Sequence, residues 1–299
     1  MKRKLTITSM LMISIFAFFA TPVYANAAES LNPPPDQYIR MAEDGEALQV
    51  AVVRFKPRSG EQNWYVDLIS AVHVADAGYF ADLNRRFSDY DVVLYEMVAP
   101  EGTKITPRQP KASGEKNADD KSNLLTSIQL AMTDVLGLSY QMDGVDYSPE
   151  HFVHADFSPE EFRQSMAKRG ESITGMILQM WRAGLARELT AGAGSQLSLL
   201  SVLMAGDKQL ALKRMVAQEL ADAEATMIAF EGPEGSTLVA ARNQKALKVL
   251  KRTRLDQKPQ SVAIFYGAAH MQDFQQRLIA DFDMVPVSIE WLDAWDLDE

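Results

Sequence analysis

The sequence predicts an α/β protein whose central sheet is mixed and largely parallel, built from two related strand–turn–helix–strand units with a large helical insertion. Three observations predict this class. Short runs rich in Val, Ile, Leu and Tyr, bounded by turn residues, are typical of strands buried on both faces. A helical pattern separates two of these runs, and one motif recurs after two of them. We expect residues 28–299 to form a single domain.

The first strand-like runs are residues 47–56, 64–72 and 91–98. Between the second and the third, residues 76–87 carry apolar side chains at helical spacing. Residues 64–98 are therefore predicted to form a β-α-β unit with a right-handed crossover. The apolar residues of the helical stripe are Tyr79, Phe80, Leu83 and Phe87.

The middle of the chain has a different character. Pro, Lys, Gly, Asp and Asn crowd into residues 100–121, which predicts a flexible surface loop. A helical insertion is expected over about 122–255, and Ser158 followed by Pro159 is typical of a helix start. Eight methionines lie in this region. We interpret them as adaptable core residues, and a soft apolar groove for a peptide or lipid-like ligand is the alternative.

The C-terminal part returns to strand and helix patterns. Residues 261–266 are predicted to form a strand, residues 273–280 a helix and residues 285–290 a final strand. The order strand, turn, helix, strand repeats that of residues 64–98. This similarity is the basis for expecting two related units in one sheet.

A short motif occurs twice, as Ser70-Ala71-Val72-His73-Val74-Ala75-Asp76 and as Gly267-Ala268-Ala269-His270-Met271-Gln272-Asp273. Each copy ends a strand and opens a helix. Ligands of parallel α/β sheets bind outside the carboxyl ends of the strands. We therefore expect His73 and His270, two of only four histidines, to share a site. The aspartate that follows each histidine by three residues is interpreted as a helix N-cap.

Glu96 is the third candidate for this site. It lies in the apolar run 92–98, where an ionised carboxylate costs several kcal/mol unless it is paired or bound to a metal. The alternative is an alternating strand with Glu96 on a wet face. Because its strand is the next one after His73, Glu96 is expected to face the same crevice.

The N-terminus predicts an exported protein. Basic residues 2–4 precede the apolar run 5–20, and Ala25-Asn26-Ala27 is a signal-peptidase pattern, so residues 1–27 are expected to be a signal peptide that is removed. The expected location is the periplasm, with no membrane span after cleavage. Removal changes the net charge from −10 to −13. An acidic chain without cysteine argues against nucleic-acid partners and excludes thiolate sites.

The sequence resembles the TraB/PrgY/GumN family, which is related to the Tiki metalloproteases. The resemblance rests on Ala71-Val72-His73, Tyr95-Glu96, Arg242-Asn243 and Gly267-Ala268-Ala269-His270, in that order, within residues 64–280. It implies a metal-dependent hydrolase, a peptidase or amidase acting on a peptide or small-molecule substrate. It also implies that His73, Glu96 and His270 are catalytic and bind Mn²⁺ or Co²⁺. Ser70 departs from the family, which usually has Gly there.

Five further residues are predicted to support the site or to bind substrate. The resemblance implies this role for Tyr95, Arg242 and Asn243, with Arg242 expected to touch the site or to brace Glu96. The alternative for Arg242 and Asn243 is a solvated helix face. Residues 150–156 contain the other two histidines, and this stretch is interpreted as a polar loop or as a source of substrate contacts. The latter interpretation adds His154 and Asp156.

Other functions stay open at this stage. Nucleophilic serine chemistry is not expected, because no Gly-x-Ser-x-Gly occurs, and neither His-Glu-x-x-His nor a phosphate-binding loop is present. The same two histidines and glutamate suit acid–base catalysis without metal. The alternative from another class is a non-catalytic periplasmic protein that binds a peptide, as PrgY-like proteins suggest, or haem, as ChaN proteins do. A degenerate hydrolase scaffold is a third possibility, which Ser70 favours.

Overall fold

The computed structural model describes most of the chain after its first 30 residues. The predicted signal peptide (1–27) and most of the predicted loop 100–121 lie outside the described residues. Side chains of residues 223–230 also lie outside the description. The described ranges are 31, 33–59, 63–100, 102–103, 105, 133–172, 174–175, 202–230 and 235–298.

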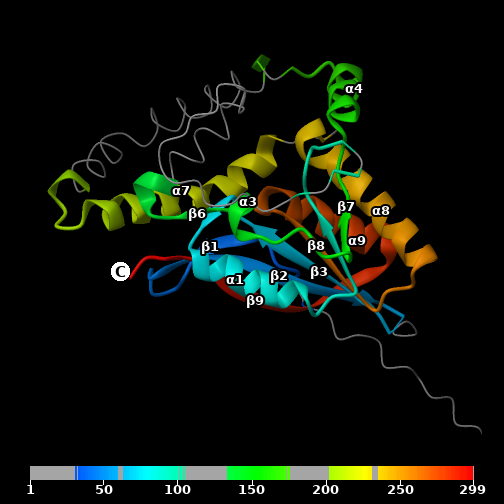
Figure 1. Ribbon diagram of the computed structural model, residues 1–299, viewed down its shortest axis with the longest axis horizontal. Coiled ribbons are helices and arrows are strands. Elements are labelled where there is room, and N and C mark those ends of the chain that lie inside the picture. The colour runs from blue at the N-terminus through cyan, green and yellow to red at the C-terminus, as the bar shows by residue number, and fades with distance from the viewer. Residues whose placement is uncertain are drawn as a thin grey trace, which may run out of the picture.

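A seven-stranded mixed sheet forms the centre of the protein (Figure 1). Four of its strands are mutually parallel neighbours, and strand β2 pairs antiparallel with the strand at one side of this group. Among the described strands of this sheet, β2 alone runs against the others, so the predicted mixed and mostly parallel α/β class is confirmed. The parallel strands are, in spatial order, β3 (Tyr65–Ala71), β8 (Ser261–Gly267), β5 (Val92–Tyr95) and β7 (Phe152–His154).

The antiparallel part of the sheet is built around β2 (Ala47–Pro57). Its first edge pairs with β1 (Ile39–Met41) and then with β3. Its other edge pairs along nearly its whole length with β9 (Met284–Asp296). A second, two-stranded sheet joins β4 (Val74–Ala75) to β6 (Ser139–Tyr140).

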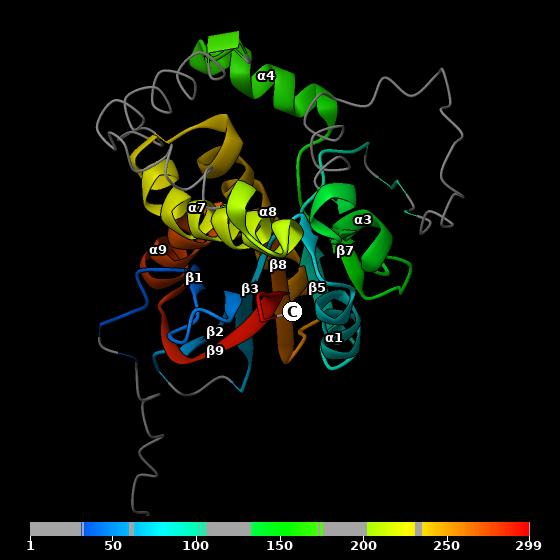
Figure 2. The same cartoon turned by 90° about the vertical axis from the view of Figure 1, so that its left-hand side faces the viewer.

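Helices cover both faces of the sheet (Figure 2). Helices α8 (Arg242–Asp256) and α9 (Met271–Phe282) pack on one face. The other face is covered by α1 (Ala77–Phe87), α3 (Gln141–Gly144) and α7 (Lys208–Phe230). Helix α4 (Pro159–Arg169) lies beyond these layers.

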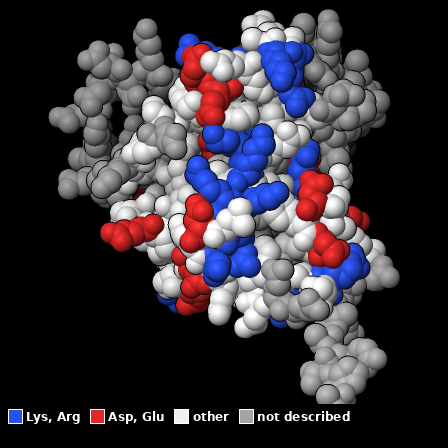
Figure 3. Space-filling view, turned by 90° about the vertical axis from the view of Figure 1, so that its right-hand side faces the viewer, with Lys and Arg blue, Asp and Glu red and all other residues white. Residues whose placement is uncertain are grey.

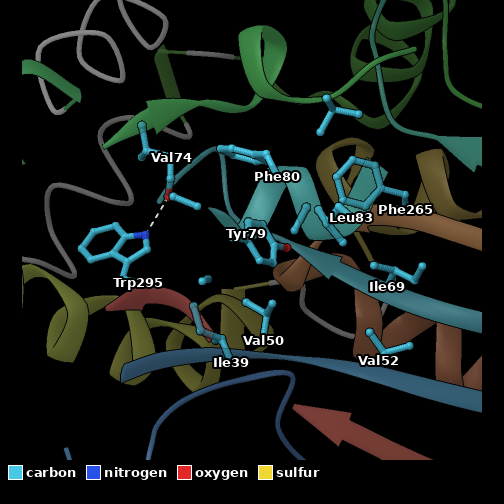
Figure 4. Close-up of a cluster of buried hydrophobic side chains, with 14 of the residues drawn as sticks. Ile39, Val50, Val52, Ile69, Val74, Tyr79, Phe80, Leu83, Phe265 and Trp295 are labelled. Atoms are coloured by element: carbon cyan, nitrogen blue, oxygen red, sulfur yellow. Dashed lines mark hydrogen bonds between the residues drawn. The ribbon is translucent and has the colours of Figure 1, made fainter. Parts of the chain in front are cut away.

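Alternating side chains of the central strand enter two different cores. In β8, Ile264 and Tyr266 pack with α8 and α9, whereas Phe265 packs on the side of α1. Strands buried on both faces must be apolar at nearly every position, which is why they are legible in the sequence. Figure 4 shows the core on the α1 side, where the Trp295 indole nitrogen donates a 2.7 Å hydrogen bond to the Val74 carbonyl.

The observed elements differ from the predicted ones in several places. The predicted helical stretch contains strands β6 and β7. The sequence does not reveal β7, because three residues are too few to show a period. Strand β5 ends at Tyr95, so Glu96 follows the strand instead of lying within it. Strand β9 extends well beyond the predicted 285–290.

The helix start at Ser158 is confirmed, whereas the predicted aspartate caps are confirmed only for the position of Asp76 and are wrong for Asp273. Ser158 accepts the Glu161 N–H and the Glu161 carboxylate accepts the Ser158 N–H, which forms a capping box. Asp76 occupies the N-cap position of α1 without a capping bond, because its carboxylate pairs with Lys213 at 3.0 Å. Asp273 lies inside the first turn of α9, where it binds Asn243 and Arg277.

Only some of the methionines are in the core. Met166 is buried and Met142 packs against the core on the α1 side, whereas Met204 is 86 % exposed. Met132, Met176 and Met180 lie outside the described residues. Within the described ranges no helix is both long and apolar enough to span a membrane.

Replacing Trp295 by Phe is expected to lower the free energy of unfolding by about 2–4 kcal/mol. The smaller ring leaves a cavity in a fully buried position, and the Val74 carbonyl loses its donor. Urea denaturation measures the change. Trp291→Phe is the matched control, because Trp291 is only partly buried. Equal losses for both variants would contradict this account of the core.

Candidate functional site

The predicted site residues lie at the carboxyl ends of three adjacent strands. Central strand β8 pairs Gly267 with Ala71 of β3 and Phe265 with Tyr95 of β5. The chain then continues to His270 after β8, to His73 after β3 and to Glu96 after β5. Parallel strands therefore bring residues that are distant in sequence to one edge of the sheet.

His270 faces Glu96 and is held from behind by an asparagine. The ring is buried, and its Nε2 atom lies 3.5 Å from Glu96 Oε1. Asn243 donates its Nδ2 protons to the His270 carbonyl and to Asp273, so its Oδ1 accepts from His270 Nδ1 at 2.7 Å. This contact assigns the proton to Nδ1 and leaves Nε2 facing Glu96.

His73 is held in the same way by a glutamine. Its Nδ1 lies 3.2 Å from Gln141 Oε1, and the Gln141 amide is oriented because Nε2 donates to the Tyr147 hydroxyl at 2.9 Å. The side chain of His73 is exposed, whereas Gln141 is buried. Among the described residues, no hydrogen bond or ion pair joins His73 to Glu96 or to His270. The structure therefore brings Glu96 and His270 into contact and places His73 at the adjoining strand end.

Glu96 is a charged carboxylate in a largely buried place. Its side chain is 14 % exposed. Oε1 accepts from Arg242 Nη2 and Oε2 accepts the Gly267 N–H, both at 2.7 Å. Burial opposes ionisation, but the charges of His270 and Arg242 outweigh it and hold the pKa of Glu96 well below its ordinary value of 4.5. The interpretation of Glu96 as a residue on a wet strand face is wrong.

Arg242 connects Glu96 to a second buried carboxylate. Its Nε and Nη2 atoms donate to the two oxygens of Asp156, at 2.9 and 2.5 Å. Arg242 is 8 % and Asp156 1 % exposed. A solvated helix face is therefore wrong for Arg242 and for the fully buried Asn243, and Arg242 does brace Glu96. The residue follows directly on a π-helical turn, Thr237–Ala241, a feature frequent at functional sites.

Tyr95 and His154 do not contact the other site residues directly. The ring of Tyr95 packs in the core on the α1 side, against Tyr147 and His154. His154 Nε2 donates to the Met97 carbonyl at 2.6 Å. Both residues hold the segment that carries Glu96. Tyr95 directly precedes Glu96, and His154 is bonded to Met97, which directly follows it. Gln141 and Tyr147 could not be found from the sequence, since no pattern links them to a histidine 68 and 74 positions away.

The sheet register shows why Ser70 is not equivalent to Gly267. The two copies of the motif align by their histidines, but in the sheet Ala71 lies opposite Gly267 and Ser70 lies opposite Tyr266. Ser70 is fully buried, and its hydroxyl has no hydrogen-bond partner among the described residues. The serine is thus an uncompensated polar group beside the site.

Comparisons of the chain with protein-family models, with curated proteins and with solved structures found no match. The resemblance to the TraB/PrgY/GumN family therefore rests on the four short motifs. Within the described ranges, no group of three or more His, Cys, Asp or Glu side chains is arranged to hold a metal ion.

Replacing Ser70 by Ala is expected to raise the free energy of unfolding by about 1 kcal/mol, because it removes a buried hydroxyl without a partner. Ser261→Ala is the matched control with the opposite sign, since Ser261 Oγ accepts the Asp91 N–H at 2.9 Å. Urea denaturation of both variants checks the pair. A loss for Ser70→Ala as large as that for Ser261→Ala would show that the Ser70 hydroxyl is satisfied.

Replacing Arg242 by Gln is expected to lower stability by about 3–5 kcal/mol, because two buried carboxylates lose their cation. Adding Asp156→Asn to this variant is expected to recover part of the loss, because it removes one of those charges. Arg163→Gln is the control: it breaks an exposed pair with Glu160 and is expected to change stability by about 0.5 kcal/mol or less. Additive losses in the double variant would contradict the proposed coupling of Arg242 and Asp156.

Proposed function

We propose that this protein is an exported hydrolase of the TraB/PrgY/GumN type, a peptidase or amidase that acts through His73, Glu96 and His270. One observation carries the proposal. Each histidine has its Nδ1 held by the oxygen of a side-chain amide, so each has Nε2 left for chemistry. The two histidines and a charged carboxylate follow three adjacent strands at one edge of the sheet, with His270 in the middle, where parallel α/β sheets bind their ligands.

The pKa of Glu96 decides how the roles are divided. A carboxylate whose pKa is held well below its ordinary range is a weak base at neutral pH. We therefore assign proton transfer to His270 Nε2 and assign to Glu96 the stabilisation of the imidazolium that forms, 3.5 Å away. To exposed His73 we assign contact with the carbonyl oxygen of the substrate. Asn243 fixes the ring of His270 and Arg242 fixes the carboxylate.

The proposed reaction is the hydrolysis of an amide bond. Water adds to the carbonyl carbon while His270 Nε2 takes one of its protons. The C–N bond then breaks, and the same proton passes from Nε2 to the leaving nitrogen. The products are a carboxylic acid and an amine. Negative charge that develops on the carbonyl oxygen is stabilised by His73 when that ring is protonated.

A divalent cation, Mn²⁺ or Co²⁺, is the cofactor that we propose for this site. His73, Glu96 and His270 would hold it, since two imidazoles and a carboxylate are ligands that suit such ions. The amide oxygens on both Nδ1 atoms match the outer contacts of metal-binding histidines. The chemistry that the cation supplies is Lewis-acid polarisation of the scissile carbonyl. The three side chains are not gathered into one ligand set here, so metal binding is tested separately from catalysis.

Hydrolysis of a peptide library by the purified protein, with Mn²⁺ or Co²⁺ added, tests the enzymatic proposal. His270→Ala and Glu96→Gln are each expected to lower turnover about 100-fold or more, because the first removes the proton-transfer group and the second removes the charge of its partner. His151→Ala is the matched control and is expected to retain activity, because His151 bonds only to the Phe87 carbonyl among the described hydrogen bonds of its ring. Peptide retention without turnover, unchanged in Glu96→Gln, would favour a binding protein and overturn the proposal.

Equilibrium dialysis against Mn²⁺ and Co²⁺, followed by elemental analysis, tests the cofactor independently of activity. The wild-type protein is expected to hold the cation, and both His73→Ala and His270→Ala are expected to lose it. The same measurement with His151→Ala, whose ring bonds to the Phe87 carbonyl away from the site, is expected to match the wild type. Equal metal content in all four proteins would exclude a cation at this site and leave acid–base catalysis by His270 standing.

A further inference from the structure

A cavity of about 610 Å³ lies between helices α8 and α9, and its lining runs along α8 from Gln244 to Leu255. It borders Trp64, just before β3, whereas His73 lies just after that strand. Seven strand residues separate the two ends by roughly 23 Å at about 3.3 Å per residue. A second hollow of about 450 Å³ shares Trp64, Arg254 and Leu255 with it and extends the groove. None of the residues proposed as catalytic lines the cavity, although Gln244 directly follows Asn243 of the candidate site.

The charge of this cavity is opposite to that of the protein. Four of its lining side chains are basic and one, Asp281, is acidic, whereas the chain carries a net charge of −10. Lys248 and Lys251 are exposed, and no carboxylate pairs with them in the described part of the chain. Figure 3 shows Lys and Arg side chains gathered over the middle of the face on which α8 and α9 lie.

The remaining two basic side chains are fixed in place. Arg277 pairs with both carboxylate oxygens of Asp273, at 2.7 and 2.8 Å. Arg254 lies over the ring of Trp64, 4.0 Å from its centre, and donates to the Pro259 carbonyl. Within the described residues, Arg254 has no carboxylate partner. Three cations of the cavity are therefore without an acidic partner there, and one of them is held against an aromatic surface.

The cavity also has an apolar part. Trp64 and Leu247 form buried walls, and Phe282 is partly buried. Leu255 lines both hollows yet is 70 % exposed. A large aliphatic side chain that stays in water beside unpaired cations is suited to cover the apolar body of an anionic ligand.

We propose that this cavity binds a small amphiphilic anion. Its aromatic or alkyl body would lie against Trp64 and Leu255, and its carboxylate, sulfonate or phosphate group would lie among Lys248, Lys251 and Arg254. The volume is in the range of small-molecule sites. A small anion experiences the local cations within a Debye length of about 10 Å, whereas a large anionic surface would also meet the net negative charge of the protein. The observations therefore favour a small molecule over a membrane or an acidic protein.

The test uses 8-anilinonaphthalene-1-sulfonate, an aromatic sulfonate whose fluorescence rises in an apolar site. Titration of the full chain is expected to show saturable binding, and the variant Lys248→Gln/Lys251→Gln is expected to bind about 10-fold more weakly, a change of 1.4 kcal/mol. Leu255→Ser tests the apolar contact and is expected to lower the affinity as well. Arg252→Gln is the matched control, because Arg252 is an exposed cation on α8 that does not line the cavity.

Competition experiments identify the chemistry of the ligand. Octanoate is expected to displace the probe, whereas octanol, which lacks the charge, and inorganic phosphate, which lacks the apolar body, are expected not to. Equal affinity in wild type, the double lysine variant and Arg252→Gln would overturn the proposal. Displacement by octanol as effective as by octanoate would show a purely apolar site, and displacement by phosphate alone would show a simple anion site. Either result would also overturn it.

Discussion

The buried ion pair network around Arg242 is the constraint on which the rest of the site depends. One guanidinium contacts two carboxylates, Asp156 after β7 and Glu96 after β5, and it projects from the start of α8. Burying these charges is costly, and the cost is offset only when the guanidinium lies within hydrogen-bond distance of both carboxylates. The network therefore ties the edge of the parallel sheet to the helix layer, and it keeps Glu96 charged beside His270.

A second constraint acts on the histidines. Both imidazoles have Nδ1 against an amide oxygen, and in each case the amide is itself oriented by other bonds: Gln141 through Tyr147, and Asn243 through Asp273 and a carbonyl. These amide contacts fix the orientation of each ring before any substrate binds. They also leave the Nε2 atom of each ring available for chemistry. Asn243 comes from α8 and Gln141 from α3, which cover opposite faces of the sheet. Both helix layers therefore hold a histidine at the carboxyl ends of the strands.

The two ends of the sheet differ in electrostatic character. The carboxyl ends of the parallel strands carry a compact network in which opposite charges compensate one another within hydrogen-bond distance. The other end, beside Trp64, carries cations without an acidic partner among the described residues, around an apolar hollow. Compensation favours a rigid site with one geometry, whereas uncompensated charge favours a ligand that brings the opposite sign. The two regions are therefore suited to different tasks.

The sequence by itself determined the α/β class, most of the two-sided apolar strands and the candidates His73, Glu96, His270 and Arg242. These features are local: strands buried on both faces are uniformly apolar, and a polar residue at a strand end stands out. Only the tertiary structure decided that the carboxylates of Asp76 and Asp273 form ion pairs instead of capping hydrogen bonds, that Asp156 neutralises Arg242 and that Gln141 holds His73. Apart from the pair of Asp273 with Arg277 within α9, these contacts join elements that are distant along the chain. Three-residue β7 has no readable period, and its place beside β5 follows from pairing, which propensity does not encode.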